Sequence, residues 1–241
     1  DGLKPTATMF QTQKQELRNA IEECSSHSKS FQEFQSLLFE KYQIQEKFQI
    51  KFEDFHTKYD KINEHLWELI RDEKIDKEYL RKHRFYDTFL HFDVDDFELA
   101  QIFEHQFLDE IIAYNELIEG SIEILEYLKS KNYTIHIISN GFHEVTHRKI
   151  DGSGIRKYVD IVTSADDVNV RKPNPRIFEY ALNQANAAKS ESILIGDDWI
   201  ADIEGARNFG IEVIFFNALR ENKTEEGLIV IQKLDEIKNY L

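Results

Sequence analysis

Three carboxylates, Asp197, Asp198 and Asp202, follow a short apolar run, residues 193–195, in the segment ILIGDDWIAD. The run predicts a buried strand that ends in a turn at Gly196. Like charges this close repel one another unless a cation is near, and carboxylate oxygens are ligands that Mg²⁺ prefers. Aspartate before a helix also caps its N–H groups. These residues alone fit metal binding and helix capping equally well.

Two further predicted strands also end in polar residues that could act on a phosphate group. The strand YTIHII ends at Ser139, and the strand VDIVTS leads to Lys172 just before a helix. Ligands of parallel sheets bind beyond the carboxyl ends of the strands, so we expect Ser139, Lys172 and Asp197 to converge there. A hydroxyl and a lysine can bind phosphoryl oxygens while carboxylates hold Mg²⁺. This set lacks a nucleophile, which in such chemistry would be another aspartate.

Two different patterns divide the chain that must position these residues. Residues 11–112 contain no glycine or proline and carry apolar residues at helical spacing, which predicts a helical bundle. From Gly120 onward, helices such as NPRIFEYALNQA alternate with apolar strands such as SILIG and EVIFF. This alternation predicts an α/β fold with a parallel sheet covered by helices on both faces. We expect a core domain from residues 1–12 and 113–241, and a helical cap domain from residues 13–112.

The motifs stand in the order found in the haloacid dehalogenase (HAD) superfamily, which the chain resembles. IISNGF is similar to the second motif of that family, RKPNPRIF to the third and IGDDWIADIEGARNFGI to the fourth. KPNPRIFEYAL and INEHLWELIRDEKIDKEYLRKHRF further resemble the YjjG-type pyrimidine 5′-nucleotidases. The resemblance implies a Rossmann-like core with an inserted helical cap. It also implies Mg²⁺-dependent hydrolysis of small phosphomonoesters through a phospho-aspartate, with pyrimidine nucleoside 5′-monophosphates as the best substrate candidate.

The resemblance also implies roles for residues around the phosphate. Ser139 would bind the phosphoryl oxygens, with Asn140 and Gly141 as further substrate-binding residues. Lys172 would hold the nucleophile and the phosphate in place. The basic segment RKHRF at 81–85 favours a solvent-exposed helix face, with the alternative that Arg84 reaches the substrate from the cap.

For the metal, the resemblance implies that Asp197 is a direct Mg²⁺ ligand. Asp202 would support the metal directly or through water. Asp198 stands where many relatives have serine, so its role would be supporting. His143 and His147 have a spacing that can bind a metal, but no third ligand is nearby in the sequence, and His136 is expected to be a core histidine.

The first motif of the family, an apolar strand ending in D-x-D-x-T, is not recognisable in the opening DGLKPTATMFQTQKQEL, where we expect no such strand. If Phe10 is aligned with the family, Thr6 falls on the motif threonine, Gly2 on the nucleophile and Lys4 on the general acid. Gly2 cannot act as the nucleophile, and Lys4 cannot act as the general acid. Either an upstream segment supplies the motif, which we favour, or the chain is an inactive relative, or Asp1 acts in an unusual register.

These alternatives lead to three functional hypotheses: a HAD-type phosphatase, an inactive phosphate- or nucleotide-binding protein, and a haloacid dehalogenase, whose reaction needs no Mg²⁺. The net charge of −15 argues against a nucleic-acid polymer as partner. No apolar run approaches membrane-spanning length, and the single cysteine, Cys24, allows no intrachain disulfide. We expect a cytoplasmic monomer or homodimer that acts on a small phosphorylated metabolite or nucleotide.

Overall fold

A computed structural model describes residues 6–9, 27–111, 115, 117–223 and 225–241 of the chain. The chain divides into two compact units. Asp1–Glu23 and Asn115–Leu241 form the α/β unit, and Cys24–Tyr114 form the helical unit. The boundaries that we expected, after residues 12 and 112, lie outside the described residues and stay a prediction. In the described ranges, no helix has the length and apolar character needed to cross a membrane.

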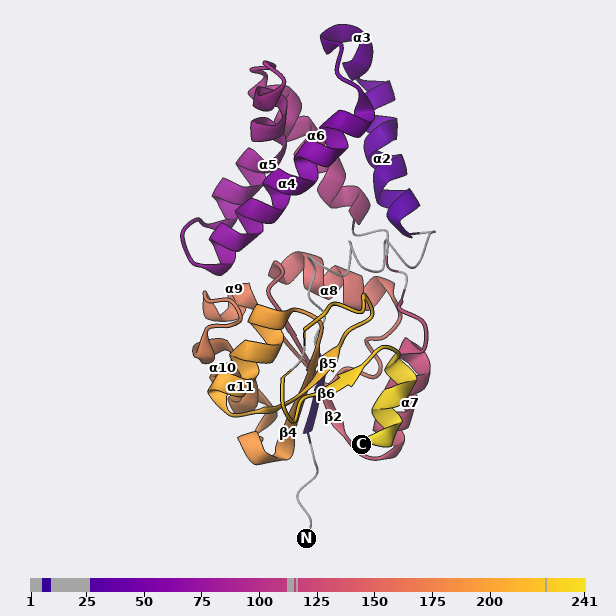
Figure 1. Cartoon of the computed structure of the whole chain (residues 1–241), viewed down its shortest axis with the longest axis vertical. Helices are drawn as coiled ribbons and strands as arrows, with labels where there is room; N and C mark the ends of the chain where they lie inside the picture. The colour runs from indigo at the N-terminus through magenta and orange to yellow at the C-terminus, as the bar shows by residue number, and fades with distance from the viewer. Residues whose placement is uncertain (1–5, 10–26, 112–114, 116, 224) are drawn as a thin grey trace. The chain divides into compact units, whose positions relative to one another are not determined.

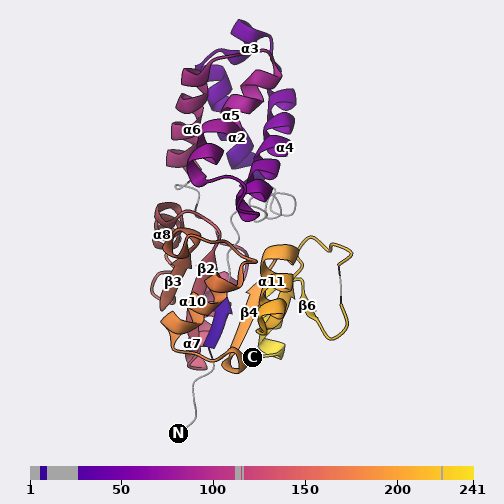
Figure 2. The ribbon, with the colours of Figure 1, turned by 90° about the vertical axis from the view of Figure 1, so that its left-hand side faces the viewer.

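The helical unit is a bundle of helices (Figure 2), and its core is aromatic. The helices are α2 (His27–Lys41), α3 (Ile44–Phe48), α4 (Phe52–Arg71), α5 (Lys77–His91) and α6 (Phe97–Ile111). The fully buried ring of Phe55 lies with its centroid 4.9 Å from those of Phe39 and Phe89. Asp76 begins α5 by accepting a hydrogen bond from the backbone N–H of Tyr79. These phenylalanines therefore form a hydrophobic core.

The α/β unit alternates strands and helices, as the sequence predicts (Figure 1). Its strands are β1 (Thr6–Met9), β2 (Thr134–Ser139), β3 (Ile161–Ser164), β4 (Ser192–Gly196), β5 (Glu212–Phe216) and β6 (Ile229–Ile231). Its helical segments are α7 (Ser121–Ser130), α8 (His143–Gly152), α9 (Ala165–Val168), α10 (Pro175–Ala185), η1 (Lys189–Glu191), η2 (Trp199–Glu204), α11 (Gly205–Phe209) and η3 (Leu234–Asn239).

The strands form one parallel sheet in the order β3-β2-β1-β4-β5-β6. Our expectation that no strand precedes the helical unit is wrong, because β1 lies in the middle of the sheet between β2 and β4. Thr6 begins this strand, so the alignment that put Thr6 on a motif threonine after the strand is also wrong. The N-terminal end of β1 is level with Thr134 and Ser192, the first residues of its two neighbours.

Each face of the sheet is covered by its own set of helices. On one face, Ile137 and Ile195 belong to a buried cluster that includes residues of α7 and η3. On the other face, Ile138 and Leu194 belong to a cluster with residues of α10, η2 and α11. Figure 1 shows α7 on one side of the strands and α10 with α11 on the other. Neighbouring residues of a strand thus face opposite layers, which explains its continuously apolar sequence.

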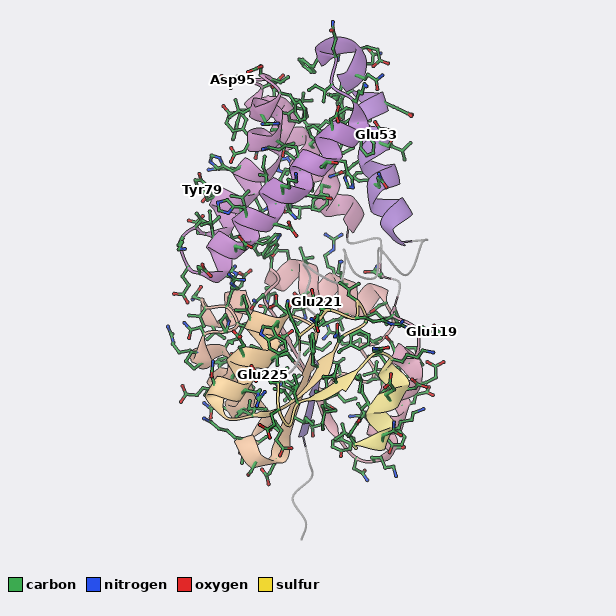
Figure 3. All side chains as sticks on the ribbon, in the orientation of Figure 1. Glu53, Tyr79, Asp95, Glu119, Glu221 and Glu225 are labelled. Carbon is green, nitrogen blue, oxygen red and sulfur yellow. The ribbon has the colours of Figure 1, made fainter. Side chains whose placement is uncertain are left out.

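Acidic side chains lie on the surface of both units. Figure 3 labels Glu53 on the helical unit and Glu119 and Glu225 on the α/β unit, and all of these residues are exposed. These exposed carboxylates contribute to the net charge of −15.

Candidate functional site

The register of the sheet brings two predicted site residues to the same level. Met9 of β1 pairs with Ile137 of β2 on one side and with Ile195 of β4 on the other. Ser139 and Asp197 each come two residues after those partners, at the carboxyl ends of strands separated only by β1. The ends of β2 and β4 therefore lie at one edge of the sheet, one strand apart, as the strand-end rule predicts.

Ser139 is buried at the end of β2, where its hydroxyl is held by the following turn and by α8. The Ser139 Oγ accepts a hydrogen bond from the backbone N–H of Gly141 at 3.0 Å and one from the Thr146 hydroxyl at 3.3 Å. A hydroxyl that accepts two bonds still has its proton to donate. The Ser139 hydroxyl is thus suited to donate to an anionic oxygen at the strand end.

Asn140 links the end of β2 to the loop that carries Lys172. The Asn140 Oδ1 accepts the backbone N–H of Lys172 at 2.7 Å, and the Asn140 Nδ2 donates to the Lys172 carbonyl at 3.0 Å. Two segments far apart in the sequence, IISNGF and RKPNPRIF, are therefore in direct contact, as the strand-end rule predicts.

Lys172 and Asp202 form an ion pair in the interior of the α/β unit. The Lys172 Nζ lies 2.6 Å from the Asp202 Oδ1, and neither side chain is exposed to solvent. Burial raises the pKa of the Asp202 carboxyl, and the neighbouring Lys172 ammonium opposes that effect. The ammonium group thus has its counter-ion within the protein, at the edge where an anion would bind.

Two glycines make room for this ion pair. A Cβ on Gly196 would lie 2.5 Å from the Asp202 Oδ2, so only glycine lets the Asp202 side chain lie against the end of β4. A Cβ on Gly205 would lie 2.8 Å from the Cβ of Pro173, which follows Lys172 through a cis peptide bond. Both glycines therefore serve the close approach of η2 and α11 to the Lys172 loop.

Asp198 caps the helical turn that presents Asp202. The Asp198 Oδ1 accepts the backbone N–H groups of Ile200 and Ala201, at 3.0 and 2.8 Å. The turn, η2, is a π-helix in which the Ile203 N–H donates to the Asp198 carbonyl at 3.2 Å. Wide turns of this kind are frequent at functional sites. The capping interpretation of the acidic segment is thus right for Asp198.

The described carboxylates do not by themselves complete a metal site. Asp198 caps η2 and Asp202 pairs with Lys172, while Asp197 is partly exposed at the end of β4. Among the residues that the structure describes, no group of three or more His, Cys, Asp or Glu side chains could hold a metal ion. Mg²⁺ usually keeps several water ligands and needs only one or two carboxylates. The role of the three aspartates in Mg²⁺ binding therefore stays a prediction.

The histidines occupy structural positions. His136 is buried, its Nε2 lies 2.8 Å from the Thr163 Oγ1, and burial lowers the pKa of its ring to about 4, which confirms the expected core histidine. The His143 Nδ1 lies 2.9 Å from the Asp167 Oδ1, and its ring is tilted against that of His147 with the centroids 4.3 Å apart. In the described chain this pair gains no third ligand.

Arg84 belongs to the core of the helical unit, so the expected solvent-exposed helix face is wrong at this residue. The alternative that Arg84 reaches the substrate stays a prediction, which its burial disfavours. Its guanidinium is buried and donates from Nε and Nη2 to the Glu104 carboxylate at 2.5 and 2.7 Å. It also lies over the ring of Phe107, 4.3 Å from the centroid. The sequence could not show this role, because the partner carboxylate stands on another helix.

Asp1, the candidate nucleophile, lies outside the described residues, and its role stays a prediction. Asp1 precedes β1, whose N-terminal end is at the edge of the sheet opposite to Ser139 and Asp197. The sequence that follows β1 reads FQTQKQE, in which Glu16 is the first carboxylate.

Comparisons with known proteins agree with this architecture. The family model described as haloacid dehalogenase-like hydrolase matches residues 73–216. Pyrimidine 5′-nucleotidase YjjG of Escherichia coli is 29% identical over 193 residues, covering 78% of this chain and 83% of that protein. Pyrimidine 5′-nucleotidase PynA of Streptococcus pneumoniae is 29% identical over 168 residues, covering 68% and 69%. The magnesium-bound HAD-hydrolase YfnB of Bacillus subtilis has the same fold, with a TM-score of 0.81, 18% identity and 99% of both chains covered.

Proposed function

Because this chain belongs to the haloacid dehalogenase-like hydrolases, we propose that its α/β unit binds the phosphate group of small phosphorylated metabolites at the edge that carries Ser139 and Lys172. The observation that carries the proposal is the contact between the two segments: Asn140, next to Ser139, bonds both backbone groups of Lys172. A buried hydroxyl and a buried ammonium are thereby held at one end of the sheet. Such preorganised donors suit phosphoryl oxygens.

The substrate class that we propose is the pyrimidine nucleoside 5′-monophosphates. Two relatives that are named pyrimidine 5′-nucleotidases, YjjG and PynA, align with more than two thirds of this chain. We further propose that Asp197 contributes to Mg²⁺ binding at the same edge, as the family resemblance implies. A divalent cation there would offset the charge of the phosphate.

Hydrolysis is the second candidate function, and the sequence after β1 favours binding without turnover. A phospho-aspartate mechanism needs an aspartate at the carboxyl end of the central strand, but residues 10–15 contain no carboxylate. An upstream segment would precede β1 and reach the opposite edge of the sheet, which weighs against an upstream nucleophile. Loss of a covalent nucleophile typically costs several orders of magnitude in rate.

Thermal unfolding with uridine 5′-monophosphate and Mg²⁺ tests the binding proposal, with uridine as the ligand that lacks phosphate. A ligand at 100 times its Kd should stabilise the chain by about 2.7 kcal/mol, whereas uridine should not. Ser139→Ala should lose most of this effect. Ser153→Ala should keep it, because the Ser153 hydroxyl donates only to the Ile150 carbonyl in α8. Equal shifts with both ligands, or full binding by Ser139→Ala, would refute the proposal.

Phosphate release from the same nucleotide separates binding from hydrolysis. We expect no release above background by the 241-residue chain. Mg²⁺-dependent release that disappears in Ser139→Ala would instead establish hydrolysis, and it would require a nucleophile among the residues outside the described ranges.

A further inference from the structure

The side chain of Asn140 makes two hydrogen bonds to one other residue, Lys172. Its amide oxygen accepts from the Lys172 N–H at 2.7 Å, and its amide nitrogen donates to the Lys172 carbonyl at 3.0 Å. The reverse orientation of the amide would place NH₂ against N–H and oxygen against oxygen, so only one orientation fits. An asparagine is thus matched to the backbone of Lys172 in both hydrogen-bonding directions.

Lys172 needs such an anchor because it stands in irregular backbone between two helices. Asn169 ends α9 in a left-handed conformation with φ at 57°, and Asn174 begins α10 as its N-cap. Between them, the Lys172 backbone has no strand partner or helical turn, since α9 ends before it and α10 begins after it. Buried polar backbone groups require hydrogen-bond partners, and Asn140 supplies both.

The position of the Lys172 backbone determines where its ammonium group lies. The Lys172 side chain has no exposed surface, and its Nζ lies 2.6 Å from the Asp202 Oδ1. Pro173, the next residue, packs closely against Gly205 of α11, where a Cβ would lie 2.8 Å from the Pro173 Cβ. A displacement of the loop away from Asn140 would therefore separate the ammonium from Asp202 and admit water.

We propose that Asn140 is a positioning residue, which fixes Lys172 through its backbone and does not itself contact the ligand. This replaces the substrate-binding role that the family resemblance implies for Asn140. One part of the inference rests on the proposed function, namely that the positioned Lys172 binds a phosphate group. That Asn140 holds Lys172 in place can be tested without any ligand.

The ligand-free test measures how fast an amine-reactive reagent modifies Lys172 in the folded protein, read out by peptide mass spectrometry. Lys172 should react slowly in the natural chain, because it is buried. Asn140→Ala removes both bonds and should raise the rate at least about tenfold, because each lost hydrogen bond contributes about 1 kcal/mol. Asn140→Asp keeps the shape and the acceptor oxygen, but its second carboxylate oxygen would face the Lys172 carbonyl oxygen and repel it. This variant should therefore also raise the reaction rate. It replaces the alanine variant if that variant does not fold.

The matched control is Asn174→Ala, on the same loop. Asn174 accepts from the backbone N–H of Arg176 and caps α10, so its loss removes a cap without removing the bonds from Asn140. The Lys172 reaction rate should stay within about twofold of the natural value in this variant, because ordinary cap loss is a local effect of about 1 kcal/mol.

The second measurement is the Kd for inorganic phosphate by calorimetry, which should rise about tenfold in both Asn140 variants. Weaker phosphate binding with an unchanged Lys172 reaction rate would overturn the inference, since it would mean direct contact between Asn140 and the ligand. If both the Lys172 reaction rate and the Kd for phosphate are unchanged in the Asn140 variants, the inference is overturned too. If the natural chain does not bind phosphate at all, the proposed function fails, while the reaction rate still decides whether Asn140 positions Lys172.

Discussion

The Lys172 Nζ and the Asp202 Oδ1 lie 2.6 Å apart, and both side chains are wholly inside the α/β unit. Charges removed from water in this way stabilise a fold only as a pair, because each one alone would be buried without compensation. The ion pair therefore joins the stability of the domain to the integrity of the candidate site.

Lys172→Met should lower the free energy of unfolding by about 3–5 kcal/mol, because it leaves Asp202 buried without a counter-ion. Adding Asp202→Leu to this variant should recover part of the lost free energy of unfolding, because it removes the unpaired buried charge and the two sites are energetically coupled. Urea unfolding measures both. Lys129→Met is the control, since the Lys129–Asp160 pair is 2.7 Å apart but partly exposed and should cost less than about 1 kcal/mol. Equal losses in the two lysine variants would contradict a special role for the buried pair.

Arg84→Met should destabilise the protein by about 3–5 kcal/mol, because the buried Glu104 would lose its buried partner and keep only the longer contact with Arg81. The affinity of the folded protein for uridine 5′-monophosphate should not change. Arg81→Met is the control, since Arg81 is partly exposed and lies 3.5 Å from Glu104. Unfolding curves measure the stability of each variant, and calorimetry measures its affinity for the nucleotide. A weaker affinity of Arg84→Met at unchanged stability would support Arg84 as a substrate-binding residue.

Asp197→Asn should abolish the Mg²⁺-dependent part of the thermal shift with nucleotide while costing little stability. Removal of one carboxylate weakens cation binding but relieves repulsion among its neighbours. Asp198→Asn is the matched variant, and it should keep the shift because asparagine also caps helices. Melting curves with Mg²⁺ and with a chelator give the comparison. The same Mg²⁺ effect in both variants would show that the ion is held elsewhere.

His136 should make folding stability depend on pH between about 4 and 6.5. Its pKa is lowered to about 4 by burial, so the folded protein binds a proton less readily than the unfolded chain. The stability linked to neutral His136 is fully present above about pH 6.5 and is lost as the pH falls to about 4. This shift corresponds to about 3 kcal/mol.

The measurement is the difference in unfolding free energy between the natural chain and His136→Gln as a function of pH, which cancels the other titrating groups. His105→Gln serves as the control, because His105 is exposed. A His136 difference that stays constant from pH 7 to pH 4.5 would contradict the lowered pKa.

The sequence predicted most of the α/β unit because its strands are short, apolar and separated by amphipathic helices. β1 was missed because TATM is short and contains only two strongly apolar residues, so no apolar run marks it. Threonine favours strands when neighbours provide a sheet, and here β2 and β4 flank it on both sides. The central place of β1 in the sheet can be recognised only from its pairing with β2 and β4.

The strand-end rule predicted which residues meet at the edge of the sheet, but it could not predict their side-chain contacts. Strand-end position is enough to bring Ser139 and Asp197 together, because the ends of parallel strands share one edge. The partners of Asn140, Arg84 and Asp202 could not be inferred, since each bonds a residue on another element. Side-chain pairing across elements depends on packing geometry, which spacing along the chain does not reveal.

The central place of β1 also sets an order of events during synthesis. β1 leaves the ribosome first, but its neighbours β2 and β4 follow only after the complete helical unit has been made. Contiguous helices fold through local contacts and are fast, whereas pairing between distant strands must first close a long loop. The helical unit can thus be folded while the earliest strand still waits for a partner. The pairing of β1 with β2 and β4 then joins segments that were made before and after the helical unit.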